Sequence, residues 1–278
     1  MKNILVISPE SKTNYVVEGS VAKTEIFTAY SCAPNETDSN CYILKIATDK
    51  KYNSILDREA YILNLLFNES QKQEEAFQKE NPGTKLRMNY HLTFPKLVET
   101  FISKDQNSRR IIILDFSHVT KRLSDLTPLI NLERKESVRV DQRSSAWILG
   151  KTLKALVFAH SEGIIVNNLS RNNVLINKKE HLVILFDWSS AEVTADIASQ
   201  ESEEIAQLAN TVIRTLGWNL KTGLIPTDVD SHTEYNELVK KFALGKGGSA
   251  KKAHTEFYDL VDRLWPREYY AFTTHPLR

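Results

Sequence analysis

Apolar residues form short runs in the first part of the chain. Such runs, separated by polar segments as strands usually are, lie at residues 4–7, 16–17, 21–29 and 41–47. Residues 57–66 instead carry apolar side chains at helical spacing, which predicts a helix. Two more apolar runs, at 94–101 and 110–116, are separated by a polar turn. Several strands and one helix are therefore predicted for this part of the chain.

In the second part of the chain, the spacing of apolar residues changes twice. Helical spacing up to His160 ends at Gly163, a residue suited to the C′ position of a helix. The polar loop 167–173 follows, and two apolar runs around a polar turn then lead to Asp187. The charged run 135–143 is expected to be solvated. Further helical patterns lie at residues 123–132 and 203–216 and, around a glycine-rich linker, at 233–264.

Composition narrows the class of protein. A chain of 278 residues, with 41% apolar and 26% charged residues, fits a soluble globular protein of one two-lobed domain or two small ones. The net charge of +1 gives no reason to expect nucleic acid or an anionic membrane as a partner. No apolar run reaches the roughly 18 residues of a membrane span, and the start is too short for a signal peptide. Cys32 and Cys41 do not make a disulfide framework, so we expect reduced thiols and a cytoplasmic location.

The order of helix, polar loop, hairpin and Asp187 resembles the catalytic core of the protein kinase fold. In that family the loop reads H-R-D-L-x-x-x-N. Here Val166 and Asn167 stand at the His and Arg positions. Asn168 stands at the catalytic Asp, and Asn173 stands at the metal-binding Asn. Asp187 begins Asp-Trp-Ser where the family has Asp-Phe-Gly.

This resemblance implies ATP and Mg²⁺ as cofactors, with Asn173 and Asp187 as the metal ligands. Asn168 stands where the family has the carboxylate that positions the acceptor hydroxyl. An amide accepts a hydrogen bond but takes no proton near neutral pH, so the base is missing. Arg171, in the same loop, is a candidate cation for neutralising a reacting phosphate.

The resemblance also implies the architecture, an α+β fold with two lobes. Residues 1–116 form a small lobe of antiparallel sheet plus one helix, with an insertion at about 68–93 that is either family-specific or a helix extension. Residues 117–278 form a mainly helical large lobe. Lys45 lies in the apolar run 41–47, where it is costly to bury without an anionic partner. In the family this Lys contacts the α- and β-phosphates of ATP and pairs with a helix Glu, here Glu59.

The expected ATP site departs from the family pattern. Gly19 is the one glycine of residues 17–23, where the family places several so that backbone N–H groups reach the phosphates. Ile43 replaces the usual Ala against the adenine ring, and such overpacking costs about 1–3 kcal/mol. Leu114 stands at the gatekeeper, with Asp115 and Phe116 at the hinge. We therefore expect Mg-ATP to bind weakly or not at all.

The chain after Asp187 is short for an active protein kinase. Fewer than twenty residues separate Asp187 from the helix predicted at 203–216, and no Ala-Pro-Glu occurs. Glu203 or Glu204 stands where the family has an anchoring Asp, and the peptide-docking platform is reduced. The aromatic segment 264–272 is expected to pack on the large lobe, with a docking peptide as the alternative.

These observations favour a pseudokinase that acts as a regulatory or binding module for a protein partner. The alternative is an active, atypical transferase that moves a phosphoryl or nucleotidyl group from ATP with Lys45, Glu59, Asn173 and Asp187. A third hypothesis is a nucleotide-free scaffold, in which Lys45 and Glu59 simply join strand to helix.

Overall fold

In a computed structural model, the described residues are 4–35, 41–219, 223–266 and 268–277. Their contacts divide the chain into two compact units. Unit 1 comprises Met1–Leu126 and the short return Trp188–Ser190, and unit 2 comprises Thr127–Asp187 and Ala191–Arg278. The sequence placed the lobe boundary near Ser117, and the division by contacts falls somewhat later, within β7 (Leu126–Pro128).

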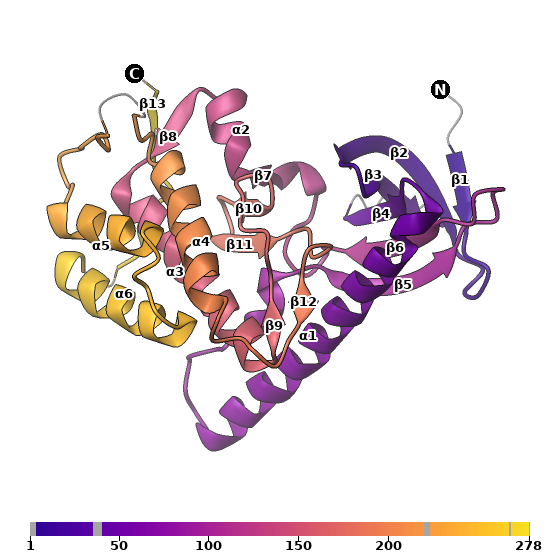
Figure 1. The fold of residues 1–278 in the computed structure, drawn as a ribbon, viewed down its shortest axis with the longest axis horizontal. Helices are drawn as coiled ribbons and strands as arrows, with labels where there is room; N and C mark the ends of the chain where they lie inside the picture. The colour runs from indigo at the N-terminus through magenta and orange to yellow at the C-terminus, as the bar shows by residue number, and fades with distance from the viewer. Residues whose placement is uncertain (1–3, 36–40, 220–222, 267, 278) are drawn as a thin grey trace. The chain divides into compact units, whose positions relative to one another are not determined.

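Unit 1 is built on a six-stranded antiparallel sheet (Figure 1). Most apolar runs of the sequence become strands because β-branched and aromatic residues favour extended backbone, but the expected strand 21–29 is interrupted by a turn at residues 24–26 and divides between two strands. In sheet order the strands are β1 (Ile4–Ile7), β2 (Asn14–Lys23), β3 (Phe27–Pro34), β4 (Tyr42–Ala47), β6 (Arg110–Asp115) and β5 (Lys96–Ile102).

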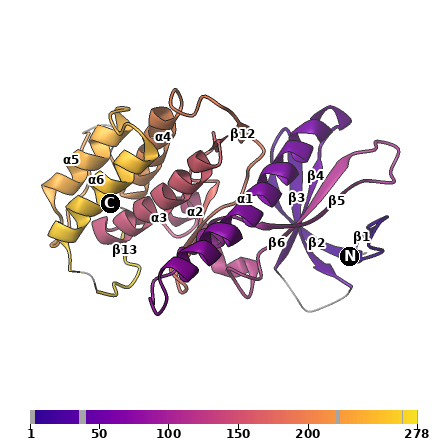
Figure 2. The ribbon, with the colours of Figure 1, turned by 90° about the horizontal axis from the view of Figure 1, so that it is seen from below.

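The long helix α1 (Asn53–Glu80) packs on β5 and β6 (Figure 2). Its buried apolar side chains Leu56, Ile62, Leu63 and Leu66 face the sheet at the spacing that the sequence predicted. The helix continues through residues 68–80, so the first part of the expected insertion is a helix extension. The Glu74 carboxylate, 2.7 Å from His91 Nδ1, ties that extension to the short helix η2 (Tyr90–Thr93).

The face of the sheet opposite to Lys45 carries its own apolar cluster. Side chains alternate along a strand, so Leu44 lies on that face while Ile43 and Lys45 lie on the other. Burial of each large apolar side chain contributes about 1.5–3 kcal/mol, which fixes the register of β4. The cluster consists of Tyr15, Val17, Cys32, Leu44, Phe101, Ile111 and Ile113.

Unit 2 is mainly helical, around α3 (Gln142–Ser161). Asp141 caps the start of α3 by accepting from the Ser144 N–H at 2.7 Å, and Gly163 follows its end with φ +74°, as predicted. A Cβ at Gly150 would lie 2.7 Å from the Phe257 ring, so glycine lets α3 and α6 approach closely. The other long helices of unit 2 are α4 (Glu201–Thr215), α5 (Thr233–Ala243) and α6 (Ala250–Leu264).

Short elements complete unit 2. The hairpin of β10 (Val174–Asn177) and β11 (Leu182–Leu185) leads to Asp187, and β12 (Glu192–Val193) pairs with β9 (Ile164–Ile165). The helix α2 (Leu129–Arg134) precedes β8 (Val138–Val140), to which β13 (Thr274–Pro276) pairs near the end of the chain.

The aromatic C-terminal segment packs on unit 2, as expected for the large lobe. The Tyr270 hydroxyl donates to Asp141, and the Thr273 N–H donates to Ser144 Oγ at 2.8 Å. Residue 267 of that segment lies outside the described residues.

Both cysteines are buried and free. Burial raises the pKa of the Cys32 thiol to about 12, so this thiol stays protonated and unreactive at neutral pH. Within the described part of the chain, no helix combines the length and apolarity that a membrane span requires.

The charged run 135–143 is not uniformly solvated, and that expectation is wrong for Arg139. Its side chain is buried, and its guanidinium donates to both carboxylate oxygens of Asp228, at 2.9 and 2.5 Å. Gly217 makes room for it, because a Cβ there would lie 2.7 Å from Arg139 Cδ. The partner is 89 positions away in the chain, so no local pattern could reveal the pair.

We expect Arg139→Ala to lower the free energy of unfolding by about 1.5–3 kcal/mol, the usual loss for buried hydrogen bonds to a charged group. Urea denaturation of the full chain measures this loss. The control is Arg122→Ala, which removes an exposed ion pair to Asp125 at 3.5 Å and should cost no more than about 1 kcal/mol. Equal losses for the two variants would show that burial of the Arg139 pair does not matter.

Candidate functional site

In unit 1, Lys45 and Glu59 form the ion pair that the sequence suggested. Lys45 Nζ lies 2.7 Å from each carboxylate oxygen of Glu59, and both side chains are 0% exposed. The Phe27 ring covers the ammonium group, with its centroid 3.7 Å from Nζ. A buried charge needs a close partner of opposite charge, so Lys45 and Glu59 each offset the desolvation cost of the other. The pair joins β4 to α1.

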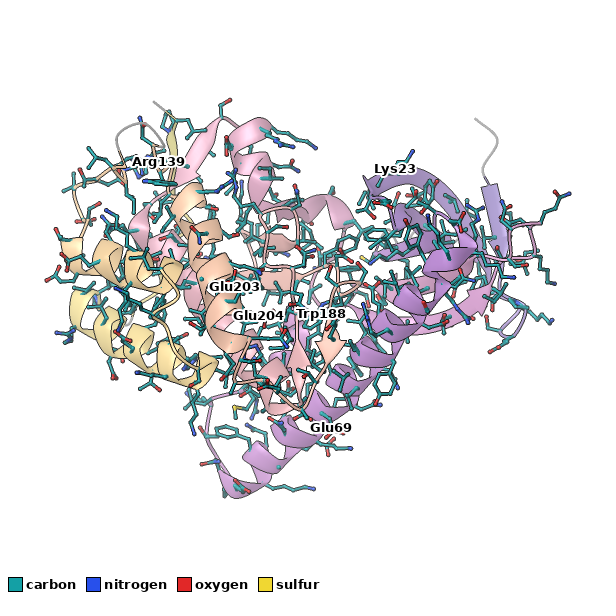
Figure 3. The ribbon with its side chains drawn as sticks, viewed as in Figure 1. Lys23, Glu69, Arg139, Trp188, Glu203 and Glu204 are labelled. Atoms are coloured by element: carbon teal, nitrogen blue, oxygen red, sulfur yellow. The ribbon has the colours of Figure 1, made fainter. Side chains whose placement is uncertain are left out.

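Glu59 also holds the residues that follow Asp187. The Trp188 N–H donates to Glu59 Oε1 at 3.0 Å, and Arg58 on the same helix donates to the Ser189 carbonyl at 3.0 Å. The Trp188 side chain is buried and meets Phe94 edge to face, with ring centroids 6.1 Å apart (Figure 3). The residue that replaces the family's Phe is therefore a fixed part of unit 1.

The strand residues expected near the adenine ring are buried in unit 1. Ile43 and Leu114 are direct cross-strand partners in β4 and β6. The Phe116 N–H donates to the Cys41 carbonyl at 2.9 Å. The Asp115 carboxylate accepts from both the N–H and the hydroxyl of Ser117, so it stabilises the turn that follows β6.

The structure places Gly19 differently from the expected phosphate loop. Residues 17–23 belong to β2, and Gly19 lies at a register shift of that strand rather than in a turn. The turn to β3 is formed by residues 24–26, where Thr24 Oγ1 accepts from the Phe27 N–H at 3.0 Å. These turn residues include no glycine, so a side chain accompanies each N–H group at the tip.

In unit 2, the Asn173 amide organises the polar loop. Its Nδ2 donates to the carbonyls of Asn168 and Asp187, at 2.7 and 2.9 Å, and its Oδ1 accepts from the Asp187 N–H at 2.5 Å. The side chain is 2% exposed. Each amide atom thus bonds to backbone, and the loop is fastened to the residue that follows the β10–β11 hairpin.

Asn168 is directed at Asp187. Its Nδ2 donates to Asp187 Oδ2 at 3.2 Å, while its Oδ1 accepts from the Ser170 hydroxyl at 2.9 Å. Two carboxylates at this separation would repel each other and require a cation or a shared proton. A neutral amide removes that requirement and satisfies an oxygen of Asp187 with a hydrogen bond.

Of the two candidates for the anchoring acid, Glu204 holds the loop. It is 1% exposed, its Oε1 accepts from the Asn167 N–H at 2.5 Å, and its Oε2 lies 2.6 Å from His160 Nε2. Asn167 has φ +59°, a left-handed conformation that asparagine tolerates better than most residues. Glu203, the next residue along α4, is exposed (Figure 3). His160 therefore joins the end of α3 to α4 through Glu204.

Arg171 is engaged by α2. Its guanidinium forms an ion pair with Glu133, and its carbonyl accepts from the Ile130 N–H at 3.1 Å. The residue thereby positions the loop against α2.

The donors that the resemblance assigns to magnesium are one amide and one carboxylate, Asn173 and Asp187. No group of three or more His, Cys, Asp or Glu side chains gathers as a metal centre among the described residues. Asp187 offers a carboxylate, but one of its oxygens accepts from Asn168, and Asn173 Oδ1 already accepts from backbone. Mg²⁺ demands near-octahedral oxygen ligation, so this set supplies at most part of its shell.

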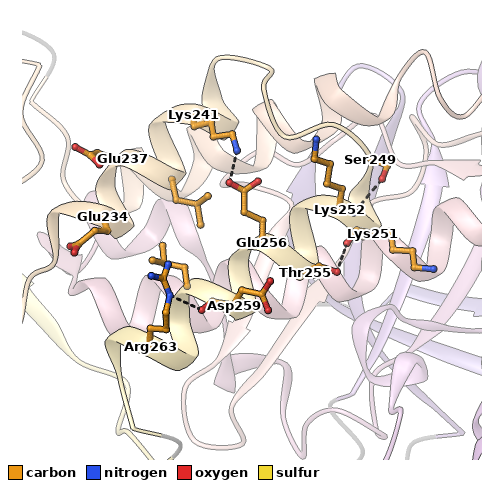
Figure 4. Close-up of a pocket in the computed structure, with 12 residues that line it drawn as sticks. Glu234, Glu237, Lys241, Ser249, Lys251, Lys252, Thr255, Glu256, Asp259 and Arg263 are labelled. Carbon is orange, nitrogen blue, oxygen red and sulfur yellow. Dashed lines mark hydrogen bonds and ion pairs between the residues drawn. The ribbon is translucent and has the colours of Figure 1, made fainter.

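A large hollow of about 910 Å³ lies elsewhere in unit 2, between α5 and α6 (Figure 4). Charges of both signs line it. Lys241 forms an ion pair with Glu256, and Arg263 donates to the Asp259 carbonyl at 3.2 Å. Such a mixture selects no class of ligand.

No protein-family model matches this chain, and no curated protein matches it significantly. The solved structures that match this chain include two kinases. The kinase PK-1 of the Cydia pomonella granulovirus aligns with a TM-score of 0.59 and 14% identity, over 86% of this chain and 92% of its own. Vaccinia related kinase 3 aligns with a TM-score of 0.63 and 12% identity, over 95% of this chain and 93% of its own. At such identities the likeness concerns the fold alone.

We expect Glu204→Gln to destabilise the chain by about 1.5–3 kcal/mol, because the buried carboxylate loses a charge-assisted hydrogen bond. The Asn167 amide should also exchange its hydrogen faster. Glu203→Gln is the matched control on the same helix turn and should change stability by less than about 0.5 kcal/mol. Urea denaturation with hydrogen exchange tests this, and equal effects for the two variants would contradict the assigned role of Glu204.

We expect Lys45→Met to cost about 3–5 kcal/mol, because it leaves the Glu59 carboxylate buried without its cation. The double variant Lys45→Met, Glu59→Gln keeps an acceptor for the Trp188 N–H and should recover at least about 1 kcal/mol relative to the sum of the single losses. A double-mutant cycle in urea measures this coupling. Strict additivity would mean that the pair does not stabilise the fold.

Proposed function

We propose that this chain, which has the two-lobed protein kinase-like fold, is a pseudokinase that serves as a regulatory or binding module for a protein partner. One observation carries the proposal. The side chain at the catalytic-Asp position, Asn168, is an amide that donates to the carboxylate of Asp187.

The chemistry of that contact removes two requirements for phosphoryl transfer together. Asn168 takes no proton from an acceptor hydroxyl, and loss of a general base costs about 10²–10⁴ in rate. Its N–H group also occupies an oxygen that a kinase reserves for the metal. Charge neutralisation supplies most of the catalysis of phosphoryl transfer, so weakening it lowers the rate further.

The environment of Lys45 supports weak nucleotide binding at most. Its ammonium group is fully buried between Glu59 and the ring of Phe27. The glycine-free turn at residues 24–26 offers phosphates no cradle of closely approachable N–H groups. The ion pair serves the fold in this proposal, and ATP is not needed for it.

The second candidate is an atypical transferase that moves a phosphoryl or nucleotidyl group. Retention of the Lys45–Glu59 pair and of Asn173 beside Asp187 favours it, because positioning alone supplies part of the rate. The following experiment separates it from the pseudokinase.

We expect about 1 mM ATP with Mg²⁺ to stabilise the chain by less than about 0.4 kcal/mol, corresponding to a melting shift below about 2 °C, since the expected Kd exceeds 1 mM. Neither γ- nor α-labelled ATP should leave label on the chain or on a generic protein substrate. Asp187→Asn and Lys45→Met are the test variants, and the exposed Lys246→Met is the control. A Mg²⁺-dependent shift that both test variants abolish, together with transfer of either label, would overturn the proposal in favour of the transferase.

A further inference from the structure

A second hollow of unit 2, about 570 Å³, lies beside the polar loop. Its walls come from α2, from residues 167–172 and from α4. The side chains that matter below are Arg134, Arg171, Asn172, Gln207, Asn210 and Arg214.

The walls of this hollow are held in place. Gln207, Asn210 and Arg214 follow one another at helical spacing, so they share one face of α4. Thr211, on that face, donates to the Leu169 carbonyl at 2.6 Å and fixes the loop to α4. Helix α2 packs against α4, and Ile130 holds the Arg171 carbonyl. A ligand therefore meets a preformed surface.

The hollow carries cations without carboxylates. None of the described residues that line it is acidic. Arg171 is neutralised by Glu133, but neither Arg134 nor Arg214 takes part in an ion pair within the described part of the chain. Each stands in the last turn of its helix, where a cation complements the helix dipole. The dipole explains each arginine singly, but it does not explain why both face one hollow that lacks a counter-charge.

Polar donors surround these arginines. The amides of Asn172, Gln207 and Asn210 also line the hollow and carry N–H groups, one of which, on Asn210 Nδ2, already donates to the Ala206 carbonyl at 2.8 Å. The segment between Asp187 and α4 contributes no described residue to the lining, so it does not cover the hollow. The volume suits one anionic side chain together with its neighbours in an extended segment.

We propose that this hollow binds a phosphorylated serine or threonine in a segment of the partner protein. Arginine forks match phosphate oxygens in bidentate fashion, and recognition of phosphorylated segments by arginine clusters is a recurring mode of binding. A dianion with several acceptor oxygens also uses the amide donors more fully than a carboxylate does. The inference rests on the proposed function in one respect, namely that the bound partner is retained rather than modified.

Fluorescence anisotropy of the full chain, without ATP or Mg²⁺, tests the proposal. The probes are three labelled Gly/Ala peptides of about eleven residues with phosphoserine, glutamate or serine at the centre. We expect the phosphoserine peptide to bind at least about tenfold more tightly than the other two, and inorganic phosphate to compete with it.

The variants localise the binding. Arg134→Gln with Arg214→Gln should weaken binding of the phosphoserine peptide at least about tenfold. Lys251→Gln with Lys252→Gln removes the same charge from the hollow of Figure 4 and should change it less than about twofold. Asn210→Asp, a substitution at an exposed helix position, should abolish binding while leaving the melting temperature unchanged.

Several results would overturn the proposal. Binding that survives the arginine substitutions places the site elsewhere, and equal loss in the lysine control reveals non-specific attraction. Equal affinity for the glutamate peptide shows that phosphate is not what is recognised. No nucleotide enters this experiment, so its failure leaves the proposed function standing. Transfer of label in the ATP experiment would overturn that function without affecting peptide binding.

Discussion

The buried carboxylate of Glu59 is the group on which unit 1 depends. It neutralises Lys45 and also accepts from the Trp188 N–H, so it joins β4, α1 and the segment 188–190 through one side chain. A carboxylate removed from water is costly unless such partners satisfy it, and removal of either partner leaves that cost uncompensated. Strand register, helix position and the path of the chain after Asp187 thus share a single electrostatic constraint. Two residues that resemble a nucleotide site have, in this way, a sufficient structural reason to be present.

In unit 2, buried side-chain hydrogen bonds to backbone groups hold the polar loop in place. The Asn173 amide joins the loop to the backbone of Asp187, and the Glu204 carboxylate accepts a hydrogen bond from the Asn167 N–H. None of these contacts involves a proton acceptor at position 168. The Asn168 side chain also donates to Asp187 Oδ2, at 3.2 Å, so amide groups at positions 168 and 173 both join the loop to Asp187.

The sequence predicted those features that depend on local period. Short apolar runs marked most strands of unit 1, and helical spacing marked α1, α3 and α4, because burial of one helix face imposes that spacing. The loop, Asp187 and the Lys45–Glu59 pair were found by their order along the chain. Gly19 did not predict the β2–β3 turn correctly, because the Thr24 hydroxyl stabilises that turn by accepting from the Phe27 N–H and no glycine is needed.

Features that depend on distant residues could not be predicted in this way. The charged run around Arg139 predicted a solvated side chain, whereas in the fold this arginine forms an ion pair with Asp228. The hollow beside the loop combines Arg134 with Arg214, which are 80 positions apart and carry no shared pattern. Each arginine is ordinary on its own helix, and the missing carboxylate becomes visible only in three dimensions. The residues that line the hollow from α4 (Gln207, Asn210, Thr211 and Arg214) all carry hydrogen-bond donors and none is an anion, so the character of the hollow follows from the packing of α2 against α4 and from no run in the sequence.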